Sequence, residues 1–69
     1  MIGTAFREHR EKLGLSQTQV ANSLFVSQPM VAQVEAGVKM PTVGMVKLAA
    51  ELFGCTTDAL IFGKERESA

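Results

Sequence analysis

Hydrophobic positions recur along this chain with the spacing of α-helices. The first apolar stripe uses spacings of three and four residues. Nowhere does the sequence alternate apolar and polar residues with the β-branched and aromatic enrichment that a strand needs. The sequence therefore predicts an all-α protein whose first helix covers 2–13 and ends at Gly14. The members of its stripe are Ile2, Ala5, Phe6, His9 and Leu13.

Serine and threonine residues mark the starts of four more helices. Ser16 and Gln19 have the spacing of a capping box, in which the hydroxyl accepts the Gln19 amide and the Gln19 side chain reaches back. Ser27, Thr42 and Thr56 are predicted to cap the next three helices. The four helices are expected over 17–24, 28–36, 43–53 and from 57 to about 62. Their expected buried residues are Val20, Ala21, Leu24, Val31, Val34, Val46, Ala49, Leu52 and Phe53.

The second and third predicted helices are short and separated by only a few residues. Ala21 is small enough to let the two axes approach, and Val26 and Val31 are placed to fill the angle between them. Pro29 is compatible with the third helix because amides of the first turn have no partner within the helix. This layout is typical of a helix-turn-helix, whose second helix enters the major groove of DNA.

Several short motifs agree with that layout. They are Gly14-Leu15-Ser16-Gln17, Val20-Ala21, Val26-Ser27-Gln28, Val31 and Val34-Glu35-Ala36-Gly37. In these positions the chain resembles the Cro/C1-type (lambda-repressor-like, Xre family) DNA-binding domain, over about residues 6–61. The resemblance implies a five-helix lambda-repressor-like fold with the helix-turn-helix at about 17–36. We expect one domain over 1–62, followed by a polar C-terminal tail over 63–69.

The resemblance also implies which residues read bases. Gln28 opens the recognition helix, where a glutamine amide can bind adenine through two hydrogen bonds. Gln33 is a second candidate for base contact. Pro29 and Met30 cannot make such paired bonds, but they could contact a thymine methyl group. The alternative interpretations are a solvent-facing role for the glutamines and a packing role for Met30.

Further positions correspond to backbone contacts and to a structural ion pair of the family. Gln17 begins the helix whose N-terminus faces a phosphate, and Lys39 and Thr42 lie in or beside a loop that contacts the backbone in relatives. Gln17 could instead serve only the capping turn, and Lys39 could be a solvated charge. Arg10 and Glu35 correspond to an ion pair between the first and third helices.

Three residues depart from what is usual or lack an evident role. Phe25 stands in the turn where the family usually has glycine, and we expect its side chain to fold against the core; an exposed Phe25 would instead suit a protein contact. His9 interrupts the first stripe and is expected to be a boundary residue rather than a pH switch. Cys55 is expected to be a small core residue rather than a reactive thiol.

Charge is the main objection to DNA binding. The 69 residues carry 7 Lys+Arg and 7 Asp+Glu, so the formal net charge is zero. Cations that neutralise phosphates supply much of the affinity for DNA, and one of the seven is expected to pair with Glu35. We therefore expect modest nonspecific affinity, helped by helix amides and by two subunits on a palindrome.

Other classes of function have little support in the sequence. We expect no enzyme, because His9 has no motif around it and Cys55 has no partner base. We expect no metal and no cofactor, since the six glycines are scattered and no cluster has metal-ligand spacing. No apolar run reaches the length of about 18 residues that spans a membrane. The single cysteine fits a reducing compartment, and we expect a cytoplasmic protein.

Two functions remain in competition. The first is a transcriptional regulator, most simply a repressor, that binds double-stranded DNA as a homodimer through Leu60, Ile61 and Phe62; these three could also simply close the core. The second is a protein-binding module on the same fold, such as an antitoxin-like or anti-repressor partner. The operator sequence does not follow from these residues.

Overall fold

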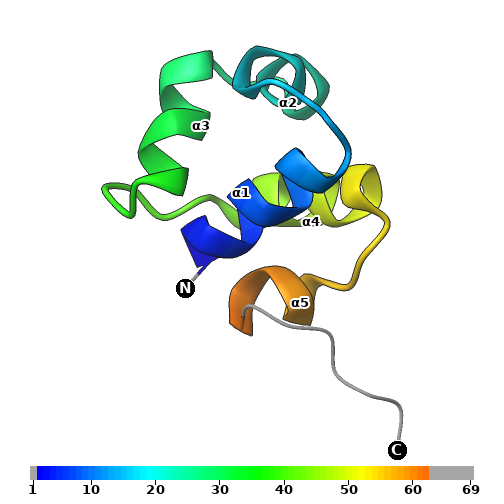
Figure 1. Cartoon of the computed structure of the whole chain (residues 1–69). Coiled ribbons are helices and arrows are strands. Elements are labelled where there is room, and N and C mark those ends of the chain that lie inside the picture. The colour runs from blue at the N-terminus through cyan, green and yellow to red at the C-terminus, as the bar shows by residue number, and fades with distance from the viewer. Residues whose placement is uncertain (1, 63–69) are drawn as a thin grey trace, which may run out of the picture.

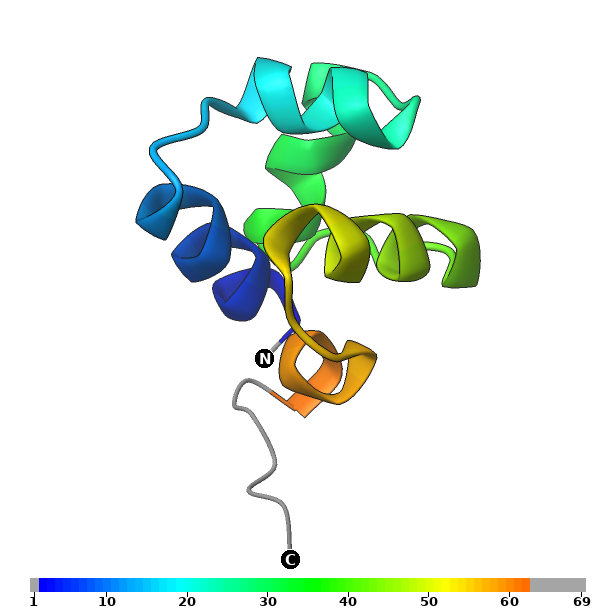
Figure 2. The same cartoon turned by 90° about the vertical axis from the view of Figure 1, so that its right-hand side faces the viewer.

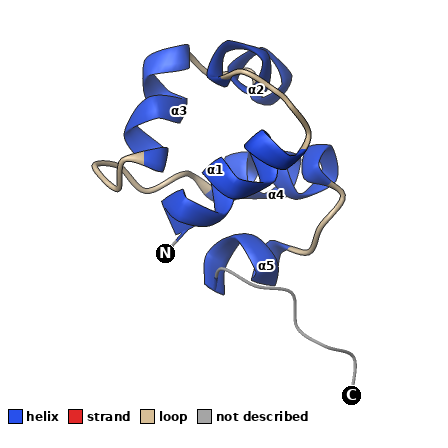
Figure 3. Ribbon diagram, in the orientation of Figure 1, coloured by secondary structure: helices blue, strands red, loops and turns tan. Residues whose placement is uncertain are grey.

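Five helices make up the computed structural model, which describes residues 2–62. Figure 1 and Figure 3 show them joined by short loops, with no strand in the described range. This confirms the all-α fold class. The polar tail expected over 63–69 lies outside the described residues. The helices are α1 (Ile2–Lys12), α2 (Gln17–Leu24), α3 (Gln28–Glu35), α4 (Val43–Phe53) and α5 (Thr57–Phe62).

Helices α1 and α4 lie between the α2–α3 pair and α5. The α2–α3 pair packs on α1 and α4, and α5 packs on the opposite side of the same two helices. Figure 1 and Figure 2 show this arrangement from two directions, with α2 and α3 above and α5 below. Helices α1 and α4 therefore form a platform that holds the α2–α3 pair.

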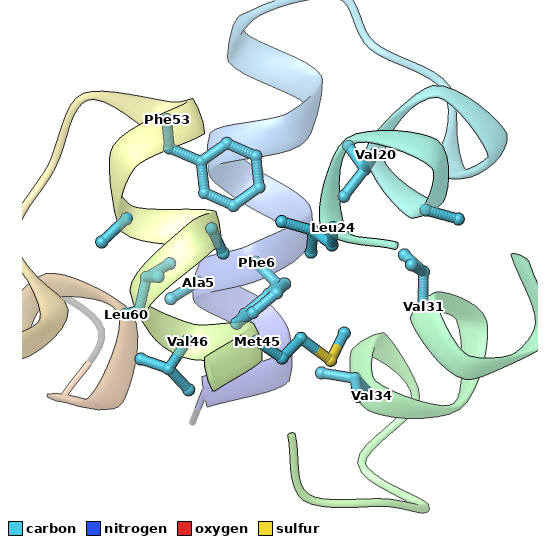
Figure 4. Packing of buried hydrophobic residues seen from close by; sticks show 13 residues of the cluster. Ala5, Phe6, Val20, Leu24, Val31, Val34, Met45, Val46, Phe53 and Leu60 are labelled. Atoms are coloured by element: carbon cyan, nitrogen blue, oxygen red, sulfur yellow. The ribbon is translucent and has the colours of Figure 1, made fainter. Parts of the chain in front are cut away.

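One hydrophobic core connects all five helices (Figure 4). Phe6 is fully buried, and its ring meets the Phe53 ring edge-on with a centroid distance of 5.8 Å. His9 is half-buried, and its ring stacks on the Phe53 ring with a centroid distance of 5.7 Å. It is a boundary residue, as expected. Cys55 is also half-buried and packs against the core.

Packing differs from the sequence prediction mainly in α4. Met45 and Ala50 are buried although the spacing did not select them, and Leu52 is only half-buried. Helix α4 meets α1, α2 and α5. A helix with neighbours on several sides buries more than one narrow stripe.

Each helix of the α2–α5 series starts with a side-chain cap, as predicted. The Ser16 hydroxyl accepts the Gln19 amide at 3.0 Å, and the Gln19 side chain accepts the Ser16 amide at 2.8 Å. The hydroxyls of Ser27, Thr42 and Thr56 accept amides three residues further on at 3.2, 3.1 and 3.1 Å. These bonds satisfy amides that have no partner inside the helix.

A left-handed residue follows each of the first four helices. Gly14, Gly37 and Gly54 have φ of 69°, 78° and 69°, and Phe25 has φ of 59°. Helix α1 ends at Lys12, one residue earlier than predicted. Leu13 has left the helix and is 51% exposed, so its predicted place on the buried stripe is wrong.

Candidate nucleic-acid interface

Helices α2 and α3 form a compact pair with one polar outer face. Ala21 is 1% exposed and Val31 is fully buried, as expected for residues at the contact between the two helices. Gln28, Pro29 and Gln33 are exposed on α3. These three residues, which we call the α3 outer face, are the exposed residues of α3.

Met30 is not a full member of that face. Its side chain is half-buried and packs against the core. Met30 is therefore mainly a packing residue, which was the alternative interpretation of the sequence. Only the exposed edge of its side chain could contact a partner. The buried Val31 and Val34 fix which side of α3 faces the core, and they therefore set how the helix is rotated about its axis.

The turn between the two helices keeps left-handed geometry without glycine. The Val26 amide donates to the Ala21 carbonyl at 3.0 Å, which satisfies a carbonyl at the end of α2. Val26 packs against the core, whereas Phe25 is 85% exposed. The prediction that Phe25 folds against the core is wrong, because the next residue takes the inward position.

Arg10 and Glu35 join α1 to the end of α3. Arg10 Nε donates to Glu35 Oε2 at 2.7 Å, and its Nη2 donates to Oε1 at 3.0 Å. The side chains are 14% and 5% exposed. Arg10 Nη1 also donates to the Leu15 carbonyl at 2.9 Å, so the ion pair fixes the loop before α2 as well.

The ion pair keeps the guanidinium charged. Hydrogen bonding to the Glu35 carboxylate raises the pKa of Arg10 above its ordinary value, and this outweighs the partial burial that lowers it. A raised pKa means that the stabilisation is complete below the unfolded-state pKa and is lost only as the pH rises through the folded-state value. Because both values lie at strongly alkaline pH, the charge of Arg10 is constant wherever the protein would be studied.

A chain of side-chain hydrogen bonds continues from the ion pair to the α3 outer face. Gln17 Nε2 donates to Glu35 Oε1 at 3.1 Å. Gln28 Nε2 then donates to Gln17 Oε1 at 2.8 Å. We call these four residues, Arg10, Glu35, Gln17 and Gln28, the glutamine relay. Sequence analysis missed both contacts of Gln17, because Glu35 is 18 and Gln28 is 11 positions away along the chain and no local pattern connects them.

The candidate phosphate contacts lie at the edges of this region. Gln17 is half-buried, and both ends of its amide are engaged in the relay. Lys39 is exposed in the loop after α3, where its amide donates to the Gln33 carbonyl at 3.2 Å. Thr42 is exposed, and its hydroxyl oxygen accepts the Met45 amide in the first turn of α4.

The three candidate dimer residues differ in their exposure to solvent. Leu60 is fully buried, so it closes the core and offers no surface to a second subunit. Ile61 and Phe62 are 44% and 67% exposed. Ile61 also lines a largely apolar groove of about 660 Å³, together with Met40 and Val43.

Residues 2–62 contain no group of three or more His, Cys, Asp or Glu side chains that could hold a metal ion. Over the same residues, none of the helices has the length and apolar character needed to cross a membrane.

Comparisons with known proteins agree with this geometry. None of the curated proteins matches the chain. Among solved structures, the nuclear magnetic resonance structure of the DNA-binding domain of the P22 C2 repressor is similar over 100% of this chain and 91% of that one, with a TM-score of 0.86 and 22% sequence identity. This likeness shows the fold. The helix-turn-helix family model matches residues 6–60, which include all of α2 and α3. This chain belongs to the Cro/C1-type helix-turn-helix family, whose members are DNA-binding regulators.

Proposed function

We propose that this protein is a sequence-specific transcriptional repressor whose α3 outer face enters the major groove of DNA. The observation that carries the proposal is the exposure of Gln28 and Gln33 on α3, with the Gln28 amide held by the glutamine relay. A base-reading side chain that is already oriented loses less conformational freedom on binding. The family and the fold support DNA binding in general, and the glutamines supply the specific part.

Base reading is assigned to the residues of the α3 outer face. Gln28 binds adenine through its free carbonyl oxygen and its remaining N–H. Gln33 contacts a base further along the groove, and Pro29 contacts a thymine methyl group. Met30 contributes only its exposed edge, because the rest of its side chain packs on the core.

Phosphate contacts are assigned to three groups at the edge of that face. They are the α2 N-terminus with Gln17, the exposed Lys39, and Thr42, whose hydroxyl still has a proton to donate while its oxygen accepts the Met45 amide. Helix N-termini attract anions through free amides and the helix dipole. Such contacts lessen the need for a positive net charge.

A homodimer on a palindromic operator would add the affinity that a neutral subunit lacks. Two subunits would read half-sites about one helical turn apart. We assign the contact to the exposed Ile61 and Phe62 at the end of α5. Sedimentation equilibrium at micromolar concentration is expected to show a dimer in the presence of operator DNA. A monomer both with and without DNA would contradict this part of the proposal.

The decisive experiment is selection of bound sequences from random duplexes, followed by the double substitution Gln28→Ala and Gln33→Ala. We expect the unsubstituted protein to enrich a defined sequence and the double variant to lose that enrichment while remaining folded by circular dichroism. Ser23→Ala, at an exposed position of α2, is the matched control and should leave the selected sequence unchanged. If the double variant still selects the same sequence, the assignment of α3 is wrong.

The second candidate is a protein-binding module on the same fold. The 85% exposure of Phe25 favours it, because a large exposed aromatic residue in a strained turn is costly without a role. The neutral net charge also favours it. The distinguishing result would be no DNA binding even at low salt, together with a protein that co-purifies in wild-type form and is lost in Phe25→Ala.

A further inference from the structure

We infer that Glu35 determines base specificity, as a positioning residue that sets the orientation of the Gln28 amide through Gln17. The inference rests on the proposed function, since it concerns the same α3 outer face. It assigns to Glu35 a role beyond the ion pair with Arg10. The role follows from the hydrogen-bonding capacity of each group in the glutamine relay.

The first step is that the Glu35 carboxylate is held in place and can only accept hydrogen bonds. It is held by Arg10 at 2.7 and 3.0 Å, and its side chain is 5% exposed. An ionised carboxylate only accepts hydrogen bonds. The group facing Glu35 Oε1 must therefore be a donor, and it is Gln17 Nε2 at 3.1 Å. A reversed Gln17 amide would bring two oxygen atoms together where little water can separate them.

The second step transfers this orientation to α3. With Nε2 of Gln17 directed at Glu35, its Oε1 faces Gln28 and can only accept. Gln28 must present its NH2 group, and it donates from Nε2 at 2.8 Å. The orientation of both amides thus follows from the acceptor-only carboxylate at the inner end of the relay.

The third step concerns the hydrogen-bonding groups of Gln28 that the relay leaves for DNA. One N–H is used by Gln17, which leaves the carbonyl oxygen and the second N–H of the exposed amide for DNA. This pair, an acceptor beside a donor in a fixed order, complements N6–H and N7 of adenine in one direction along the groove. If Gln17 were free to turn, Gln28 could turn with it, and its acceptor and donor would exchange places. Glu35 therefore selects one of two hydrogen-bonding patterns without contacting DNA.

The test compares two variants that weaken the same ion pair. Glu35→Gln replaces the acceptor-only group by one that can also donate, whereas Arg10→Lys leaves the carboxylate in place but loses the paired guanidinium geometry. Affinities are measured for four duplexes that differ only at the base pair whose preference Gln28→Ala abolishes. Measurements are made at a low temperature at which circular dichroism shows both variants folded.

We expect Glu35→Gln to reduce the preference for adenine at that base pair by about tenfold, within the discrimination that one bidentate contact provides. Arg10→Lys should retain the preference even though it lowers the melting temperature. Equal loss of preference in both variants would show that Glu35 acts only through stability and would overturn the inference. Retained preference in Glu35→Gln would overturn it as well.

Gln17→Met provides a second line that leaves the ion pair intact. It removes the middle of the relay, so it should relax the same base preference, and Glu35→Gln should add nothing further in the Gln17→Met background. Additive effects of the two substitutions would contradict transmission through Gln17. Failure of the proposed function itself looks different, because the unsubstituted protein would then show no preference among the four duplexes.

Discussion

Phe25 concentrates conformational strain at a single residue. A left-handed conformation costs a residue with a Cβ atom about 1–2 kcal/mol relative to glycine, and Phe25 has φ of 59° and ψ of 38°. Its side chain recovers little by packing, because it is 85% exposed. Three helices of the same protein use glycine at the corresponding place, so the strain is not required by this type of turn.

Phe25→Gly is therefore expected to stabilise the protein. Relief of the left-handed strain outweighs the extra freedom of glycine in the unfolded chain, which leaves a net gain of about 0.5–1 kcal/mol. The measurement is the free energy of unfolding in urea. Phe25→Ala is the control, since it removes the ring but keeps the Cβ atom and most of the strain. A loss of stability in Phe25→Gly would mean that the ring makes a stabilising contact.

Substitution by alanine is expected to have opposite effects on stability at Gly3 and at Gly44. A Cβ atom at Gly3 would clash with the Val34 carbonyl oxygen and lie 2.9 Å from that of Glu35, whereas Gly44 has nothing within 4 Å. Gly3→Ala should lower the free energy of unfolding by about 1–3 kcal/mol because backbone must move. Gly44→Ala should raise it by about 0.5–1 kcal/mol through helix propensity.

Thermal unfolding of the two alanine variants tests this pair directly. The expected order of melting temperatures is Gly44→Ala, then the unsubstituted protein, then Gly3→Ala. A Gly3→Ala protein as stable as the parent would contradict the close approach of α1 to the end of α3. Because Glu35 lies at that approach, the same displacement should also disturb the glutamine relay.

At the scale of the helix, local signals were sufficient to predict the elements. Ser16, Ser27, Thr42 and Thr56 each cap the helix that the sequence predicted for them, because a cap depends on residues only three positions apart. The same reasoning located α2 at its observed bounds. What is encoded within one turn of helix can be inferred without knowing the tertiary structure.

Features that depend on contacts between helices could not be predicted in this way. Burial of Met45 and Ala50 requires knowledge of which helices surround α4. The exposure of Phe25 follows from the inward position of Val26 in the folded turn. In the candidate site, the pairing of Arg10 with Glu35 came from a family resemblance, whereas the contact of Glu35 with Gln17 appeared only in three dimensions.

The Ser27 cap leads to a prediction about α3 as an element. Its hydroxyl accepts the Met30 amide at 3.2 Å in the turn that carries Gln28. Ser27→Ala should cost about 1 kcal/mol of unfolding free energy and loosen the first turn of α3. Ser23→Ala, inside α2, should be neutral or slightly stabilising, because alanine favours helix interiors. Urea denaturation of both variants checks this, and equal stabilities would show that the cap is not needed.

At the scale of the whole molecule, the absence of net positive charge decides how DNA is held. With 7 positive and 7 negative residues, long-range attraction to phosphates is weak. Arg10 pairs with Glu35, so its charge is not available to neutralise a phosphate. In the complex that we propose, affinity would come from amides at helix N-termini, from base contacts and from the proposed dimer. A protein of this kind should depend less on salt than a basic domain of the same fold.

The dependence of DNA affinity on salt concentration tests this view. The plot of log affinity against log salt should have a shallow slope, and Lys39→Ala should reduce it by about one unit per binding unit if Lys39 contacts a phosphate. Lys39→Arg is the control, because it keeps the charge and should keep the slope. An unchanged slope in Lys39→Ala would remove this lysine from the interface. A steep slope in the unsubstituted protein would instead show that cations dominate binding despite the neutral total, because each neutralised phosphate releases bound counterions.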